Sequence, residues 1–260
     1  MTAIDFSGIT ERSGVMASDE QLSILLTRYE LARSFSTNKD VLEIACGSGV
    51  GLTYLAKAAN RLCAGDIDSS NVELAKKATK NIDNVEVDVI DAHKLDFPNE
   101  SFDTVILFEA IYYLSDIDTF MSEVKRVLKP NGKLIISSVN CEWPGSNPSP
   151  HSIKYYSAKE LQELLRDNGF DVKVLAGFFD NLNSPVKKII RIIRQFAIKF
   201  HLIPKTMKGK KLLKRLFLGN LTPIPNEVSD DMSEKESLVE INFSEPQTNY
   251  KMLYFIATKL

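Results

Sequence analysis

The sequence predicts an α/β fold with a doubly wound, seven-stranded, mostly parallel β-sheet and a helical insertion before the last strand. Two observations predict this class. From residue 40 to residue 179, apolar runs of strand length alternate with amphipathic segments of helix length, as in β–α–β units joined by right-handed crossovers. Residues 181–248 then separate the last two predicted strands, and a connection of that length indicates an insertion with structure of its own.

The elements are expected in chain order, beginning with a helix that has Ser18 as its N-cap and apolar residues at helical spacing. The run 102–110 is apolar enough for a strand buried on both faces. "KPNG" (129–132) is a turn that stops a helix, and Gly169 ends the last one. The predicted strands are 40–46, 61–68, 85–92, 102–110, 133–140, 170–179 and 250–259, and the predicted helices are 18–35, 51–59, 71–80, 116–128 and 157–169.

These elements divide the chain into four regions. We expect an N-terminal lid and helix (1–37), an α/β core (38–180), a basic helical insertion (181–248) and the final strand of the core (249–260).

Composition limits the function. The 260 residues are 44% hydrophobic and 25% charged, with a net charge of −2, so nothing draws the whole chain toward nucleic acid. Three scattered cysteines without a CxxC pair predict neither a disulfide framework nor a metal site. The N-terminus lacks a signal-peptide pattern, and no run of about 18 apolar residues occurs. We therefore expect a cytoplasmic protein with no nucleic-acid partner and no metal.

A turn of small residues follows the first core strand, in "VLEIACGSGVG" (41–51). Ligands of doubly wound sheets bind at the carboxyl ends of the strands, where small residues let them approach the backbone. The dinucleotide pattern GxGxxG fails, because Leu52 or Val50 stands where its third glycine would be. The phosphate loop also fails, because no lysine follows. A tight turn without any ligand is the alternative that this stretch alone leaves open.

Three carboxylates, Glu43, Asp66 and Asp91, stand at or near the ends of successive predicted strands. Asp66 lies 19 residues after Gly47, the spacing at which an acidic residue accepts hydrogen bonds from ribose hydroxyls. Asp91 is placed to accept a hydrogen bond from an adenine amine. Together the three suit a ligand with an ammonium group, a diol and an amine, and they would repel a pyrophosphate. Each one alone could equally be a cap or turn residue.

Five motifs contain or flank these residues: "VLEIACGSG", "AGDIDSSNVELA", "VIDAHKLDFPNESFD", "FEAIYYLSD" and "EVKRVLKPNGKLIISS". With them, residues 38–140, and more weakly the chain to residue 180 and from residue 249, resemble class I S-adenosylmethionine (SAM)-dependent methyltransferases. The resemblance implies SAM as the cofactor. It implies binding roles for Glu43, Ala45, Cys46, Gly47 and Gly49 (methionine part), Asp66 with Ile67 beside it (ribose), Asp91 and Ala92 (adenine), and Phe108 and Glu109 (floor near the sulfonium). Ala45 stands where the family most often has glycine, and it should be tolerated if its φ is negative.

Candidate acceptor residues follow the fourth and fifth core strands. Tyr112 and Tyr113 stand where similar methyltransferases often carry two histidines. We expect at least one, with Tyr113 as the catalytic candidate, to pack the acceptor or face the sulfonium as a cation–π partner. The loop 140–161 holds His151, the general-base candidate, for which a solvated surface role is the alternative. "NPSP" in this loop is not the NPPY-type motif of nucleic-acid amino-methylating enzymes, which argues against base methylation.

A finer resemblance concerns "TERSG" (10–14), "RYELARSF" (28–35) and the loop around His151. These stretches are similar to methyltransferases found with bacterial surface-polysaccharide and sugar-modifying enzymes. The resemblance implies a lid of Glu11, Arg12, Arg28 and Tyr29 over the cofactor. Arg12, Tyr29 and Tyr112 are the acceptor-binding candidates.

The predicted insertion is strongly basic in its first part. Residues 181–226 contain no Asp or Glu and eleven Lys or Arg, and "VKKIIRIIRQFAIKF" (186–200) places apolar residues on one helical face and basic residues on the other. Such a helix packs on the domain or a second subunit, covers the active site, or lies on an anionic membrane. Peripheral membrane contact through residues 186–215 is therefore one of three interpretations of this segment. The sequence predicts no oligomeric state.

The sequence thus predicts a SAM-dependent methyltransferase with a small-molecule acceptor, a sugar or glycoside hydroxyl being favoured. Two alternatives are kept. One is a membrane-surface methyltransferase of a lipid or quinone, and the other is a non-catalytic or NAD-linked nucleotide-binding protein.

Overall fold

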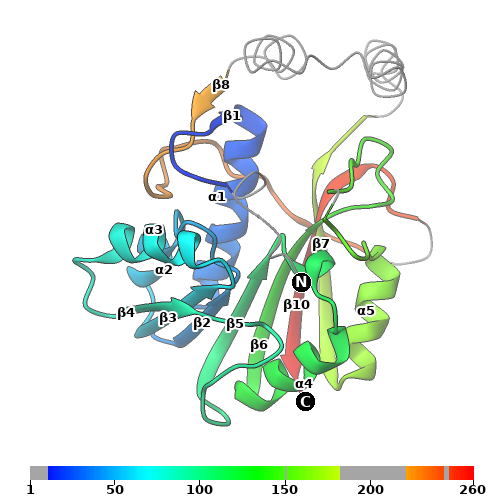
Figure 1. Ribbon diagram of the computed structural model, residues 1–260. Helices are drawn as coiled ribbons and strands as arrows, with labels where there is room; N and C mark the ends of the chain where they lie inside the picture. Colours follow the sequence, from blue (N-terminus) through cyan, green and yellow to red (C-terminus); the bar gives the residue numbers. More distant parts are fainter. Residues whose placement is uncertain (1–10, 150, 182–220, 243–245) are drawn as a thin grey trace.

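One large β-sheet organises the part of the chain that the computed structural model describes, which is residues 11–149, 151–181, 221–242 and 246–260 (Figure 1). The strands of this sheet are β2 (Asp40–Ile44), β3 (Arg61–Asp66), β4 (Val85–Val89), β5 (Phe102–Phe108), β6 (Leu128–Val139), β7 (Phe170–Phe179), β9 (Val239–Glu240) and β10 (Tyr250–Lys259). They lie in the order β4–β3–β2–β5–β6–β10–β7–β9. From β4 to β6 all pairings are parallel, and β10 runs antiparallel between β6 and β7. The carboxyl ends of the parallel strands therefore meet at one edge.

All seven predicted strands are present and the predicted fold class is confirmed, with two differences. The sheet has an eighth strand, β9, which pairs with the edge of β7 and comes from the predicted insertion. The predicted turn 129–132 is wrong, because it lies inside β6. There the register shifts between Phe102 and Thr104 and Asn131 takes a φ of +61°, so the chain bulges within the ladder without leaving it.

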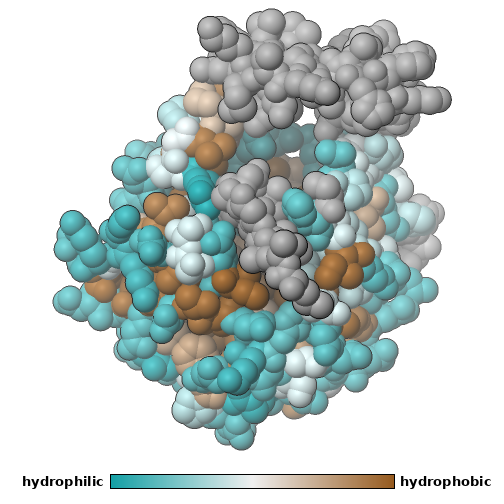
Figure 2. All heavy atoms as spheres, viewed as in Figure 1, coloured by the Kyte–Doolittle hydropathy of each residue, from teal (hydrophilic) through white to brown (hydrophobic). Residues whose placement is uncertain are grey.

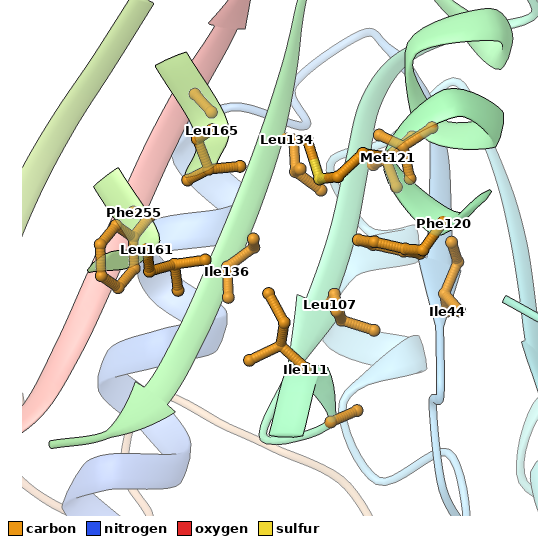
Figure 3. Packing of buried hydrophobic residues seen from close by; sticks show 14 of the residues in the cluster. Ile44, Leu107, Ile111, Phe120, Met121, Leu134, Ile136, Leu161, Leu165 and Phe255 are labelled. Atoms are coloured by element: carbon orange, nitrogen blue, oxygen red, sulfur yellow. The ribbon is translucent and has the colours of Figure 1, made fainter. Parts of the chain in front are cut away.

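Helices cover both faces of the sheet. They are α1 (Asp19–Ser34), α2 (Leu52–Ala56), α3 (Ser69–Thr79), α4 (Ile117–Val127) and α5 (Ala158–Asp167), with a 3₁₀ turn, η1 (Ile111–Tyr113). Leu134 and Ile136 of β6 belong to the core that includes residues of α4 and α5 (Figure 3), whereas Ile135 between them belongs to the core shared with α1 and α2. This alternation follows from the two-residue period of a strand. A stretch of strand that is buried on both faces must therefore be apolar at consecutive positions, as β6 is from Leu134 to Ile136.

The last described part of the predicted insertion returns to the N-terminal segment (Figure 1). β8 (Leu221–Pro223) pairs antiparallel with β1 (Met16–Ser18). Beyond β8, Ile224 and Val228 are buried in the α1 core, and the Val228 N–H donates to the Val50 carbonyl at 2.8 Å. Residues 221–242 contain no helix, so the predicted helical character of the insertion is wrong for this stretch.

The amphipathic basic helix predicted at 186–200, and the membrane contact predicted for 186–215, lie outside the described residues. Within the described ranges, none of the helices combines the length and the apolar character needed to cross a bilayer.

Candidate active site

The turn between β2 and α2 is built from residues with positive φ. Ala45, Gly47 and Gly49 have φ of +58°, +57° and +80°. The condition set for tolerating alanine at position 45, a negative φ, is not met: the turn needs a left-handed residue there, and alanine adopts this conformation at a cost of about 1 to 2 kcal/mol.

Two of the glycines in this turn are explained by packing. A Cβ on Gly51 would lie 1.9 Å from the ring of Tyr29 on α1, and a Cβ on Gly49 would lie 2.8 Å from the Cβ of Ala75 on α3. The turn thus holds two helices close to it. The sequence reading assigned its small residues to ligand approach, and for Gly51 the structure shows a different role.

Asp66 connects the turns after β2 and β3. Its Oδ2 accepts from the Gly47 N–H at 2.9 Å, and its Oδ1 accepts from the Asp68 N–H at 2.9 Å and from Asn71 Nδ2 at 3.3 Å. A carboxylate has about four acceptor positions, so a position remains for a hydroxyl of a diol. Ile67, the next residue, is 57% exposed and offers an apolar surface beside that carboxylate.

Asp91 and Ala92 follow β4 at the same edge. The Oδ1 of Asp91 accepts from the His93 N–H at 2.9 Å and lies 2.8 Å from His93 Nδ1. His93 Nε2 accepts from the Asp116 N–H at 3.3 Å, so Nδ1 carries the proton. Burial raises the pKa of Asp91, but the hydrogen bonds from His93 outweigh it and the pKa lies below its usual value. The hydrogen bonds from His93 therefore keep the carboxylate ionised and able to accept a further hydrogen bond. The sequence analysis assigned His93 no role.

Glu43 and Arg28 are buried ionisable groups beside the glycine turn. Glu43 is 1% exposed, and its Oε1 accepts from the Tyr29 hydroxyl at 2.7 Å. Burial raises its pKa to about 7. Arg28 is 5% exposed, with one guanidinium nitrogen paired to Glu11. Within the described chain, Glu43 Oε2 and the Nε and Nη1 of Arg28 have no hydrogen-bond partner.

Phe108 ends β5, and Glu109 follows it, next to these groups. The Phe108 ring meets the Tyr29 ring edge-on at 5.3 Å between centroids, and the Arg28 guanidinium lies 5.7 Å from the Phe108 centroid. Glu109 has a φ of +50°. The structure thus brings Glu43, Phe108 and Glu109 into one cluster with Arg28 and Tyr29.

Aromatic residues form the neighbouring surface. Tyr112 is buried and stacks on Tyr155 at 4.3 Å with an interplanar angle of 18°, and Tyr113 meets Tyr112 edge-on at 4.6 Å. The Ile153 N–H donates to the Tyr112 carbonyl at 2.8 Å, which ties the loop after β6 to η1. Tyr155 was missed by the sequence reading, although its place in that loop was a usable signal.

Two acceptor-side candidates lie in different surroundings. His151 is exposed, and its backbone N–H donates to Ser149 Oγ at 3.4 Å. Arg12 donates to Asn71 Oδ1 at 2.8 Å on α3, next to the residue that contacts Asp66. Arg12 is thus near the group predicted to bind ribose.

The residues at this edge fit SAM. A buried carboxylate oxygen without a partner suits the ammonium of the methionine part, and two buried guanidinium nitrogens without a partner suit its carboxylate, because unpaired buried polar atoms are costly. Asp66 has acceptor capacity for a ribose hydroxyl, and Asp91 for an amine. In the described residues no cluster of His, Cys, Asp and Glu could hold a metal ion.

Comparisons with known proteins agree with this geometry. Residues 42–136 match the family described as "Methyltransferase domain". A probable SAM-dependent methyltransferase of Mycolicibacterium smegmatis is 33% identical over 155 residues, which are 58% of this chain and 59% of that protein. A fatty-acid O-methyltransferase of the same species is 34% identical over 67% of this chain and 63% of its own.

Solved structures show the same fold. A SAM-dependent methyltransferase of Aquifex aeolicus superposes with a TM-score of 0.52 at 24% identity, covering 62% of this chain and 92% of that one. A SAM-dependent methyltransferase of Thermotoga maritima superposes with a TM-score of 0.58 at 17% identity, covering 93% and 92%. The fold is that of the class I, Rossmann-like methyltransferases.

Residues 42–136 thus match a methyltransferase domain with the class I fold, and the proteins to which the chain is similar include SAM-dependent methyltransferases. The chain spans somewhat under three fifths of the length of the first curated relatives it matches.

Proposed function

We propose that this protein transfers the methyl group of SAM to an oxygen atom of a small molecule. The observation that carries the proposal is the pair of buried groups beside the glycine turn, Glu43 and Arg28, whose unpartnered atoms complement a zwitterionic methionine group. The names of similar proteins support oxygen as the acceptor atom, since four of them are O-methyltransferases.

In this proposal the protein binds and orients the reactants. When bound, SAM supplies an electrophilic methyl group, so the protein contributes mainly position and exclusion of water. Glu43 and Arg28 bind the methionine part, and Asp66 binds the ribose. Asp91 accepts from the adenine amine, with Ile67 and Ala92 against the ring.

A hydroxyl of a sugar or glycoside is the acceptor we favour. Tyr112, Tyr113 and Tyr155 present packed aromatic rings beside the predicted methyl-transfer position, and such rings combine apolar faces with polar tips. The loop after β6 adds hydroxyl and amide groups, such as Ser149 and Asn147, that suit a polyol. In this scheme Tyr113 and His151 contact the acceptor.

A lipid or quinone hydroxyl is the second candidate. Ile153 and Phe179 are 61% and 57% exposed, and Figure 2 shows hydrophobic residues gathered near the centre of one face. Similar proteins include a fatty-acid O-methyltransferase and a ubiquinone biosynthesis O-methyltransferase. In this case the basic segment 186–215 would make the peripheral membrane contact.

The first experiment is calorimetric titration with SAM, S-adenosylhomocysteine (SAH) and NADH. Binding of SAM and SAH without NADH supports the proposal, and binding of NADH alone overturns it. Arg28→Met should weaken SAM binding about 10- to 100-fold, the loss expected for a hydrogen-bonded charge pair. Arg33→Met is the matched control, because Arg33 lies on the same helix but pairs with Glu30 and Asp230 at the surface.

The acceptor is then identified with methyl-labelled SAM. Transfer of label is followed by mass spectrometry against glycosides, hydroxylated lipids and quinols, with and without anionic vesicles. Label on glycosides alone supports the sugar acceptor, whereas label on lipids that depends on vesicles favours the second candidate. Tight SAM binding without transfer to any of them would favour a non-catalytic cofactor-binding protein.

A further inference from the structure

Glu109 has an unusual backbone and a fixed side chain at the end of β5. Its φ of +50° lies in the left-handed region, which non-glycine residues adopt at a cost and which clusters at functional sites. Its N–H donates to the Ser137 carbonyl at 3.1 Å. The same residue of β6 donates through Oγ to Glu109 Oε1 at 3.1 Å, so β6 holds both the backbone and the carboxyl group.

Both carboxyl oxygens of Glu109 are oriented. Oε1 accepts from Ser137, and Oε2 accepts from the Tyr112 hydroxyl at 3.2 Å. Each oxygen retains a further acceptor position. A carboxyl group that is held at both oxygens, yet can still accept a hydrogen bond, has the features of a positioned proton acceptor.

The groups around Glu109 come from every neighbouring element. Arg28 of α1 and Glu11 of the N-terminal segment act electrostatically on the Glu109 carboxyl group. This carboxyl group in turn acts electrostatically on the hydroxyls of Tyr254 in β10 and Tyr155 in the loop after β6. Burial raises the pKa of Glu109 above its usual value, and Arg28 opposes this shift. Tyr254 is fully buried, and its hydroxyl has no partner within the described residues.

The other candidate base has a different environment. His151 lies exposed on the loop after β6, and a base works best when a second group fixes its orientation. Glu109 has two such groups, and it directly follows Phe108, which contacts the cluster beside the glycine turn.

We propose that Glu109 is the proton acceptor of the methyl transfer, an inference that rests on the proposed function. The acceptor oxygen forms a bond to the methyl carbon while the carbon–sulfur bond breaks, its electron pair remaining on sulfur as a neutral thioether. The hydroxyl proton passes to a carboxylate oxygen of Glu109 and then to solvent. The assignment implies that Glu109 lies beside the cofactor's sulfonium.

The first test uses proton release and needs no acceptor. SAM carries a positive sulfonium and SAH a neutral sulfur, and a nearby positive charge lowers the pKa of a carboxyl group. At the pH where Glu109 is half protonated in the free protein, SAM binding should release roughly half a proton more than SAH binding. Calorimetry in buffers of different ionisation enthalpy measures this difference.

Glu109→Gln should abolish that difference while changing the SAH dissociation constant less than about threefold. Glu100→Gln should preserve it, because Glu100 also has a positive φ, of +54°, but is exposed on a turn. Equal proton release with SAM and SAH in the wild type, or an unchanged difference in Glu109→Gln, overturns the proposal.

The second test uses turnover with the acceptor found above. The wild-type rate constant of the chemical step should fall at acid pH as Glu109 is protonated. Glu109→Gln should lower this rate constant about 10²- to 10⁴-fold, the usual contribution of a general base. The fall of the rate constant at acid pH, the acid limb of the pH profile, should disappear in this variant. Wild-type turnover in Glu109→Gln overturns the proposal.

Ser137→Ala gives an independent test that keeps the carboxyl group. The Ser137 hydrogen bond lowers the pKa of Glu109, so its loss should move the acid limb to higher pH. An unmoved limb counts against Glu109. If the wild type methylates no acceptor at all, the proposed function fails, while proton release still decides where Glu109 lies.

Discussion

Tyr29→Phe tests the buried contact between α1 and the first core strand. Tyr29 and Glu43 are 2% and 1% exposed, and the phenol donates to the carboxyl group at 2.7 Å. Phenylalanine keeps the ring that packs on Gly51 and Phe108, so the change removes mainly one hydrogen bond. A bond to an ionised group contributes about 1.5 to 3 kcal/mol and a neutral one about 1 kcal/mol.

The expected loss depends on pH in a defined direction. The pKa of Glu43 is about 7 in the folded protein against an ordinary 4.5, so the folded state binds the proton more tightly. The group therefore favours folding at low pH, and this contribution disappears as pH rises through about 7. Tyr29 lowers that pKa, so its removal deepens the loss at high pH. We expect Tyr29→Phe to cost about 2 to 3 kcal/mol at pH 8 and about 1 kcal/mol at pH 5.5.

Urea denaturation at both pH values measures these free energies of unfolding. Tyr54→Phe is the matched control, because the Tyr54 hydroxyl contacts Glu30 and Asp230, whose pKa values are lowered. Its cost should stay below about 1 kcal/mol at both pH values, because the carboxylates of Glu30 and Asp230 are exposed to water. The reasoning is refuted if Tyr29→Phe costs the same at both pH values, or less than about 0.5 kcal/mol at pH 8.

Three further substitutions test the turn and the cofactor site. Ala45→Gly should raise the free energy of unfolding by up to about 1 kcal/mol, because relief of the left-handed strain exceeds the added entropy of the unfolded chain; a lower urea midpoint would contradict this. Gly51→Ala should lower it by about 1 to 3 kcal/mol, since the new Cβ meets the Tyr29 ring; an unchanged melting temperature would show that α1 moves freely. Asp66→Ala should weaken SAM binding by about 1 to 3 kcal/mol, as hydroxyl donors lose their acceptor; unchanged affinity in calorimetry would remove the ribose assignment.

Local patterns in the sequence are sufficient for the order of the elements. β7 and β10 have the predicted bounds, because runs of strand length rich in apolar and aromatic residues predict strands even where a face reaches water, as at Asp171 and Lys173 of β7. The same logic places Glu43, Asp66 and Asp91 near one edge, since parallel strands end together. Those inferences need only neighbouring residues and the sheet's connectivity.

Contacts between residues far apart in the chain could not be predicted from the sequence. The return of Val228 to Val50, the packing of Gly51 on Tyr29 and the extended course of 221–242 all depend on segments that meet only in the folded chain. The hydrophobic periodicity of a single segment does not predict which distant segment it will contact.

The sequence by itself determined the class of fold, the glycine turn and the carboxylates at its edge, because these follow from periodicity and residue type. Only the tertiary structure decided which of these groups are charged, strained or unpaired. Burial and the surrounding dipoles set those properties, and they raise the pKa of Glu43, leave Arg28 with unused donors and fix Glu109 between β6 and η1.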